Sequence, residues 1–287
     1  DKQQAWNDLL RLTGDKNHNV RSSAFRALDS AFFDIPDKQQ AWNDLLRLIN
    51  DKDHDVRSSA SRVLDYVFIQ VPDKQQAWND LFRLAKDKDW LVRSNAAEVL
   101  GSAFSQVPDK QQAWNDLHRL INDENIFVRI SATLALESAF SQMPDKQQAL
   151  NNLLRLINDK DHEVRSSAAY ALGSAFSHFS DKRQAWNDLL KLTNDQNSYV
   201  RSSSNHSLGR VSIFMASQAE TEENYKKELE EAIKFFEIAT KEVSYNNPAK
   251  FCLLFYRSFY TIISKRQEAK EEVNKYLEEA KSAIKGS

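Results

Sequence analysis

Residues 37–72 read DKQQAWNDLLRLINDKDHDVRSSASRVLDYVFIQVP, and close copies of this stretch run along most of the chain. The copies keep one spacing of 36 residues, which is the signature of a repeat architecture. Each copy opens with Asp-Lys-Gln-Gln-Ala, or with Asp-Lys-Arg-Gln-Ala in the last one. We therefore expect six units in the range 1–216, at 1–36, 37–72, 73–108, 109–144, 145–180 and 181–216.

Each unit predicts two helices. Asp37 and Gln40 form a capping-box pattern, in which the carboxylate accepts a backbone N–H and the amide reaches back. Apolar residues then recur at helical spacing until about Asn50, and an Asp or Asn at place 17 of every unit caps a second helix. One hairpin cannot bury both of its faces, so neighbours must stack. We predict an all-α fold, an α-α superhelix (solenoid) of six 36-residue helical hairpins plus a C-terminal three-helix segment.

The C-terminal segment, 217–287, does not share the repeat. Its apolar pattern predicts helices over 221–243, from Pro248 to about Ser264, and from about Gln267 to Ile284. We interpret them as a cap that closes the open end of the array, with a separate docking module as the alternative. The first unit has no such cap, which predicts either upstream residues or self-association through this uncapped N-terminal repeat.

Composition narrows the class of protein. Only five glycines and five prolines in 287 residues favour helices over turn-rich β-structure. The formal net charge of −2 removes a global electrostatic argument for nucleic acid or anionic membranes. The chain shows neither an apolar run long enough to span a membrane nor a signal-peptide pattern, so we expect a cytoplasmic protein.

The second half of the unit resembles HEAT repeats, in particular the short HEAT-like repeats of bilin lyases. The similarity is fullest in Asp159 followed by Val164-Arg165-Ser-Ser-Ala168-Ala-Tyr-Ala-Leu-Gly173, and the Val-Arg pair stands in all six units. The resemblance implies an armadillo-like superhelix whose second helices line a concave surface. It also implies a structural ladder between neighbouring repeats, formed by Asp15, Asp51, Asp87, Asp123, Asp159 and Asp195 with Arg21, Arg57, Arg93, Arg129, Arg165 and Arg201.

The sequence offers little catalytic chemistry. His18, His54 and His162 share one place in their units, but the other units carry no histidine there, so we predict solvated side chains and no metal site. Cys252 lies in an apolar helix and is expected to be an inert core thiol. Glycine-rich phosphate loops are missing. We therefore expect no enzyme and no cofactor.

Nucleic acid is an alternative partner. Basic residues recur on the outward face of the first helices and would follow a phosphate backbone. Acidic residues three positions earlier, Asp8, Asp44, Asp80, Asp116 and Asp188, lie on the same face and can neutralise them. Nucleic acid is thus the less favoured partner of this outer ladder, which consists of Arg11, Arg47, Arg83, Arg119, Arg155 and Lys191.

The favoured function is a non-catalytic scaffold that binds a protein or peptide on the concave second-helix surface, where Phe25, Tyr66 and Tyr170 are candidate contacts. A sharper candidate lies where two units replace polar residues by apolar ones, either as a partner site or as local packing between repeats. It comprises Trp90, Leu91, Ile126, Phe127, Ile130 and Leu134. Family resemblance alone adds a third interpretation, an accessory subunit in cofactor or metalloenzyme maturation.

Overall fold

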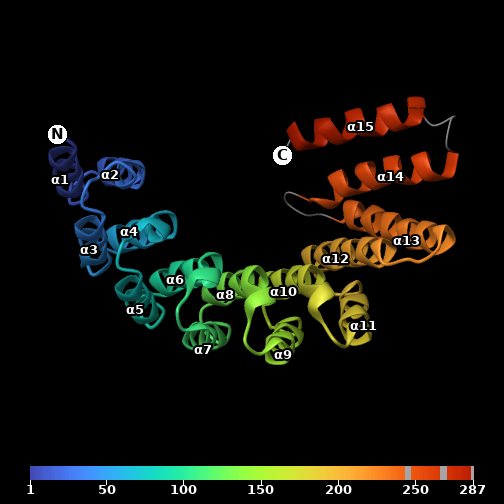
Figure 1. Ribbon diagram of the computed structural model, residues 1–287, viewed down its shortest axis with the longest axis horizontal. Coiled ribbons are helices and arrows are strands. Elements are labelled where there is room, and N and C mark those ends of the chain that lie inside the picture. Colours follow the sequence, from blue (N-terminus) through green and yellow to red (C-terminus); the bar gives the residue numbers. More distant parts are fainter. Residues whose placement is uncertain (243–246, 266–269, 286–287) are drawn as a thin grey trace. The chain divides into compact units, whose positions relative to one another are not determined.

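The computed structural model describes residues 1–242, 247–265 and 270–285, with side chains given throughout except at 65–66, 265, 270–272 and 283–285. Every regular element in these ranges is a helix, so the predicted all-α fold is confirmed (Figure 1). Long helices alternate with short turns, and short 3₁₀ helices follow four of the long ones. These are η1 (Phe68–Gln70), η2 (Phe104–Gln106), η3 (Phe140–Gln142) and η4 (Phe176–His178).

The helices of the repeats begin at matching places. The first helices are α1 (Lys2–Leu12), α3 (Lys38–Ile49), α5 (Lys74–Leu84), α7 (Lys110–Leu120), α9 (Lys146–Leu156) and α11 (Lys182–Leu192). The second helices are α2 (His18–Phe32), α4 (His54–Val67), α6 (Trp90–Ser102), α8 (Ile126–Ala139), α10 (His162–Ala175) and α12 (Ser198–Ser217).

The helix starts are held by side-chain caps. Asp37 accepts the backbone N–H of Gln40 at 2.9 Å, and Asp53 accepts that of Asp55 at 2.9 Å. The reciprocal half of the expected capping box is wrong, because the Gln40 amide reaches forward to Asp44 at 2.9 Å. Gln112 likewise donates to Asp116 at 2.8 Å.

The chain divides into two compact units, Asp1–Pro144 and Asp145–Ser287. In the first unit, Trp6, Trp42, Trp78 and Trp114 fill the space between stacked hairpins and are almost completely buried. The indole N–H of Trp6 donates to Asp44 of the next repeat at 3.1 Å. Asp44 is therefore buried, which corrects its predicted outward position.

The second unit holds the last two hairpins and the C-terminal helices α13 (Glu222–Lys241), α14 (Ala249–Lys265) and α15 (Lys270–Lys285). Figure 1 shows α13 beside α12, α14 beside α13, and α15 beside α14, in agreement with the contacts between these helices. Phe236, Leu253 and the alanines around them form the core of this stack. Val243, at the end of the first predicted C-terminal helix, lies outside the described residues.

No helix within the described ranges combines the length and the apolar character that crossing a membrane requires.

Candidate protein-binding surface

The arginine of the Val-Arg pair first fixes the turn of its own repeat. Arg57 Nη1 donates to the carbonyls of Asp51 and Lys52, both at 3.0 Å. Arg129 repeats this geometry with the carbonyls of Asp123 and Glu124 at 2.9 and 3.0 Å. The guanidinium thereby satisfies carbonyls of the turn that joins the two helices of the repeat.

The other side of the guanidinium reaches the next repeat. Arg93 donates two hydrogen bonds to the Asp123 carboxylate, at 2.7 and 2.8 Å. Arg165 and Asp195 form the same bidentate pair at 2.8 and 2.9 Å. Such paired N–H···O bonds are the strongest geometry available to a guanidinium and a carboxylate.

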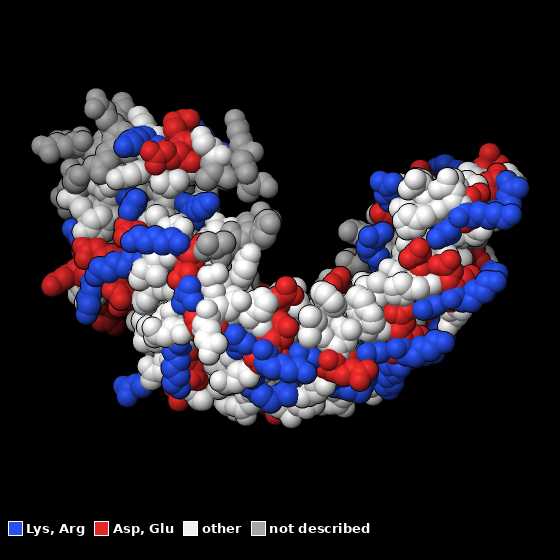
Figure 2. Space-filling model, turned by 180° about the vertical axis from the view of Figure 1, so that it is seen from behind, with Lys and Arg blue, Asp and Glu red and all other residues white. Residues whose placement is uncertain are grey.

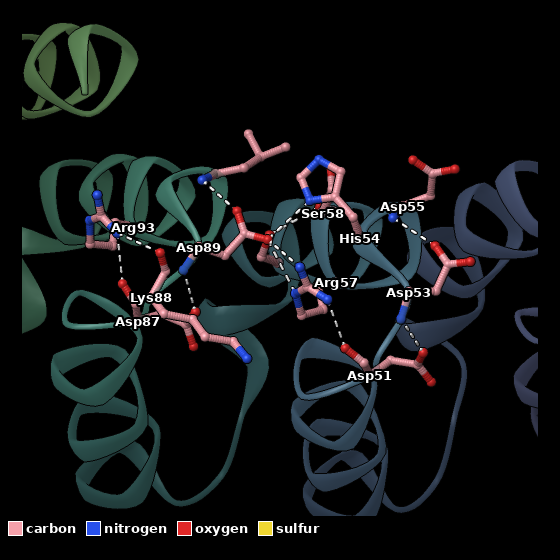
Figure 3. A network of polar contacts seen from close by, with 12 residues as sticks. Asp51, Asp53, His54, Asp55, Arg57, Ser58, Asp87, Lys88, Asp89 and Arg93 are labelled. Carbon is pink, nitrogen blue, oxygen red and sulfur yellow. Dashed lines mark hydrogen bonds and ion pairs between the residues drawn. The ribbon is translucent and has the colours of Figure 1, made fainter. Parts of the chain in front are cut away.

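Two rungs of the ladder differ from the expected pairing. Arg57 bonds to Asp89 at 2.7 Å instead of Asp87 (Figure 3). Arg21 bonds to Asp55 at 3.2 Å. Asp89 is the cap of the following second helix, and Asp55 lies two residues after such a cap. In the two pairs that use the turn aspartate, Arg93–Asp123 and Arg165–Asp195, the following cap is an asparagine, Asn125 or Asn197.

Electrostatics favours these pairs. Burial alone would raise the pKa of Asp89, but hydrogen bonds from Arg57 and His54 hold that pKa below its usual value. Burial likewise acts to raise the pKa of Asp123, but the hydrogen bonds from Arg93 and the Asn125 backbone N–H, together with the charges of Arg93 and Arg119, lower it overall. Both carboxylates therefore stay ionised and hold neighbouring repeats together.

The C-terminal segment continues the ladder. Arg201, in the last repeat, bonds to Glu242 at 2.8 and 2.7 Å, just after α13 ends. This carboxylate occupies the role that a further repeat would supply with its turn aspartate. The hydrogen bond from Arg201 lowers the pKa of Glu242.

The histidines at the start of the second helices are not merely solvated. His54 Nδ1 lies 3.0 Å from Asp89 Oδ2, and His18 Nδ1 lies 3.3 Å from Asp55 Oδ2. Both are therefore part of the contact between repeats. Among the residues the structure describes, no group of three or more His, Cys, Asp or Glu side chains is placed to hold a metal ion.

The outer basic ladder is neutralised. Arg119 pairs with Asp116 at 2.7 Å, and Lys191 pairs with Asp188 at 2.6 Å. Arg83–Asp80, Arg11–Asp8 and Arg47–Asp44 are further pairs. In Figure 2, basic and acidic atoms lie intermixed on the face shown, so the basic residues do not form a field of one sign.

The apolar residues singled out in two repeats do come together in the first unit. Trp90, at the start of α6, stacks on Phe127 of α8, with ring centroids 5.1 Å apart and planes 29° from parallel. Phe127 stays 48% exposed and Leu134 stays 41% exposed. Trp90, Leu91, Ile126 and Ile130 are half-buried. We call these six residues the α6–α8 patch. Packing between the two repeats covers only part of it.

The other candidate contacts lie elsewhere. Phe25 is buried at 1% exposure, so it belongs to the core and not to the surface. Tyr170 is half-buried in the second unit, where its ring stacks on His206 at 5.7 Å and the Arg210 guanidinium lies over it at 5.2 Å. The side chain of Tyr66 lies outside the described residues.

His206 lies on the second helix α12, and the C-terminal helices bury it. Its exposure is 4%, Phe236 of α13 packs against it at 5.7 Å, and Cys252 Sγ of α14 lies 3.8 Å from its Nε2. Burial, with a smaller effect from Arg210, lowers the pKa of His206 to about 4. Burial also raises the pKa of Cys252. Both groups are neutral near pH 7, so they do not form an activated thiolate.

Comparison with solved structures places this fold. YibA of Escherichia coli is 18% identical, with a TM-score of 0.59 over 93% of this chain and 96% of that chain. A chain in a structure of Kap95p with RanGDP is 15% identical, with a TM-score of 0.60 over 96% of this chain and 38% of that chain. A chain in the Pds5–Scc1 complex is 13% identical, with a TM-score of 0.55 over 98% and 47%. At these identities the likeness shows the fold alone.

Sequence comparison gives the family. No curated protein matches the sequence. The sequence model of HEAT repeats matches residues 44–137, 80–173 and 117–209, which together span more than half of the 287 residues. The matched segments contain five of the six Val-Arg pairs, and the ladder pairs Arg57–Asp89, Arg93–Asp123 and Arg165–Asp195. The chain belongs to the HEAT-repeat family.

Proposed function

We propose that this chain is a non-catalytic scaffold that binds a protein or peptide on its second helices, with the α6–α8 patch as the principal contact. Structures with the same fold include complexes with protein partners, Scc1 with Pds5 and RanGDP with Kap95p. Stacked hairpins that share a ladder make a rigid surface, which suits recognition of a partner at little entropic cost.

The observation that carries the proposal is the partial exposure of an aromatic pair. Other units place His or Ser where Trp90 and Ile126 stand, so stacking of the repeats does not require apolar residues there. Phe127 nonetheless remains 48% exposed after stacking on Trp90. Exposed apolar clusters of this kind mark interaction sites, and aromatic anchors dominate binding energy at protein interfaces.

The test is retention of a protein from native extract by immobilised wild type and by the double variant Phe127→Ala, Leu134→Ala. Both side chains are more than 40% exposed, so their truncation leaves the core intact. Phe33→Ala is the matched control, because Phe33 is 55% exposed on the repeat formed by α1 and α2. Circular dichroism verifies that all three proteins keep the same helix content.

We expect wild type and Phe33→Ala to retain the same protein, and the double variant to lose it at least tenfold, which corresponds to about 1.4 kcal/mol. Equal retention by all three proteins contradicts the assignment of this patch. Retained material that disappears on nuclease treatment, with affinity falling steeply as salt rises, contradicts a protein partner and favours the outer basic ladder.

A further inference from the structure

Place 26 of the repeats forms a row on the first unit. Arg26, Arg62, Glu98 and Leu134 occupy this place on α2, α4, α6 and α8. Each of these helices packs against the next, so the four side chains follow one another across one layer. All four are exposed, and Leu134 belongs to the α6–α8 patch. The row therefore runs from two guanidinium groups to an apolar surface.

The basic end of the row lines a cavity. A cavity of about 290 Å³ lies between α2 and α4 and is lined by Phe25, Arg26, Asp29, Arg62 and Val63. Arg21 and Arg57, on the same two helices, are held in ion pairs with the following repeat. Within the described part of the chain, neither Arg26 nor Arg62 has an ion-pair or side-chain hydrogen-bond partner. Their N–H donors are available to a ligand.

The cavity also contains one unsatisfied acceptor. Oδ1 of Asp29 is buried without a hydrogen-bond partner. Burial raises the pKa of Asp29, and the charge of Arg62 acts in the opposite direction. Two guanidinium groups beside one carboxylate leave an excess of positive charge among the described lining residues. A singly charged carboxylate fits this balance better than a phosphate dianion, which Asp29 would repel.

We propose that the Arg26–Arg62 cavity binds an Asp or Glu side chain of an extended peptide segment, whose apolar residues reach the α6–α8 patch. Guanidinium groups bind carboxylates through paired hydrogen bonds, and arginine clusters recognise acidic motifs. This inference deepens the function proposed above and rests on it, since it names the class of partner.

The geometry also gives the spacing of the motif. Packed helices lie about 8–10 Å apart, so two steps from α4 to α8 span roughly 16–20 Å. An extended chain covers about 3.3–3.6 Å per residue, so about five or six residues separate the acid from the apolar anchor. Glu98 lies between them and repels acids in the middle of the segment.

The experiment is selection of a displayed library of random 14-residue peptides on the full chain. Wild type is compared with Arg26→Gln, Arg62→Gln, with Phe127→Ala, Leu134→Ala, and with the control Arg11→Gln, Arg183→Gln. The control also removes two exposed arginines, but from the first helices α1 and α11. Circular dichroism verifies equal folding of the four proteins.

We expect peptides selected on wild type and on the control to carry Asp or Glu about five or six residues from an aromatic or aliphatic residue. Arg26→Gln, Arg62→Gln should abolish the acidic preference, keep the apolar one, and weaken a synthesised wild-type peptide at least tenfold. Phe127→Ala, Leu134→Ala should abolish the apolar preference and keep the acidic one.

Apolar enrichment without acids on wild type overturns the arginine site and leaves the proposed function standing. Acidic enrichment that survives in Arg26→Gln, Arg62→Gln also overturns the site. A selected peptide that binds more than tenfold tighter with phosphoserine in place of its acid overturns the assignment to a carboxylate. Failure to enrich any peptide on wild type contradicts the proposed function and this inference together.

Discussion

At the scale of single residues, His206 shows how neighbouring helices change the exposure and the pKa of a side chain. The repeat pattern places it at the same position as Arg26 and Leu134, which are exposed. In the second unit that position lies beneath α13 and α14, where Phe236 and Cys252 cover the imidazole. Its Nδ1 has no hydrogen-bond partner, so the cost of burial falls directly on the charged form.

Lowering the pH should therefore reduce the stability of the folded chain through protonation of His206. The unfolded chain takes up a proton near pH 6.5, whereas the folded chain does so only near pH 4. Between these values the unfolded state binds more protons, so stability is lost as the pH falls from about 6.5 towards 4. Lowering the pH from 7 to 5 should reduce the free energy of unfolding by about 2 kcal/mol through this group.

Urea denaturation of wild type and His206→Phe at both pH values measures the effect. Phenylalanine keeps a ring against Tyr170 and Phe236 but cannot take up a proton. The variant should lose about 2 kcal/mol less than wild type on going to pH 5. An equal loss in the two proteins would show that His206 does not carry this dependence.

Burial at this scale was only partly predictable from the sequence. The residues at the places of Phe25 and His206 differ from unit to unit. Variation shows only that stacking does not need a particular residue there. It does not show whether a later helix covers the position, as α13 and α14 cover His206.

At the scale of helices, the ladder joins one hairpin to the next. Arg93→Ala should destabilise the chain by about 2–3 kcal/mol, because it removes a bidentate bond and leaves the Asp123 carboxylate without its partner. Arg11→Ala is the control, since its side chain is 80% exposed and lies 3.5 Å from Asp8. Exposed pairs of that kind contribute under about 1 kcal/mol.

Chemical denaturation of both variants measures the loss in free energy of unfolding that each substitution causes. A similar small loss for Arg93→Ala and Arg11→Ala would mean that apolar stacking alone joins these repeats. The sequence predicted that an arginine of one repeat would pair with an acid of the next, but it did not predict which acid. Arg57 pairs with the cap residue Asp89, whereas Arg93 pairs with the turn residue Asp123, which precedes an asparagine cap.

Close helix packing makes a second prediction at this scale. A Cβ at Gly101 would lie 2.5 Å from Ala135 Cα of α8, and backbone cannot move aside as a side chain can. Gly101→Ala should therefore destabilise the first unit by about 1–3 kcal/mol. At Gly14 the nearest atom would be 3.6 Å away, so Gly14→Ala should change stability by less than about 0.5 kcal/mol. Thermal unfolding of the pair measures the difference, and equal midpoints would contradict the tight α6–α8 contact.

At the scale of the whole molecule, a period of 36 residues with Asx caps was enough to predict helical hairpins that stack. The division into compact units was not predictable, because it falls between two repeats of nearly the same sequence, after Pro144. The apolar patch was found from its break with the repeat pattern. The Arg26–Arg62 cavity was missed, since each arginine alone is an ordinary exposed residue, and their significance depends on what lines the space between two helices.

The most direct test of partner binding is site-specific photo-crosslinking. A benzophenone amino acid placed at Phe127 reports what contacts the α6–α8 patch, and one at Asn115, exposed on the first helix α7, reports the opposite layer of the same repeat. After irradiation in native extract, we predict a discrete adduct with another protein at 127, lost in the Leu134→Ala background, and none at 115. Equal adducts at both positions, or none at 127, would contradict a protein-binding surface on these second helices.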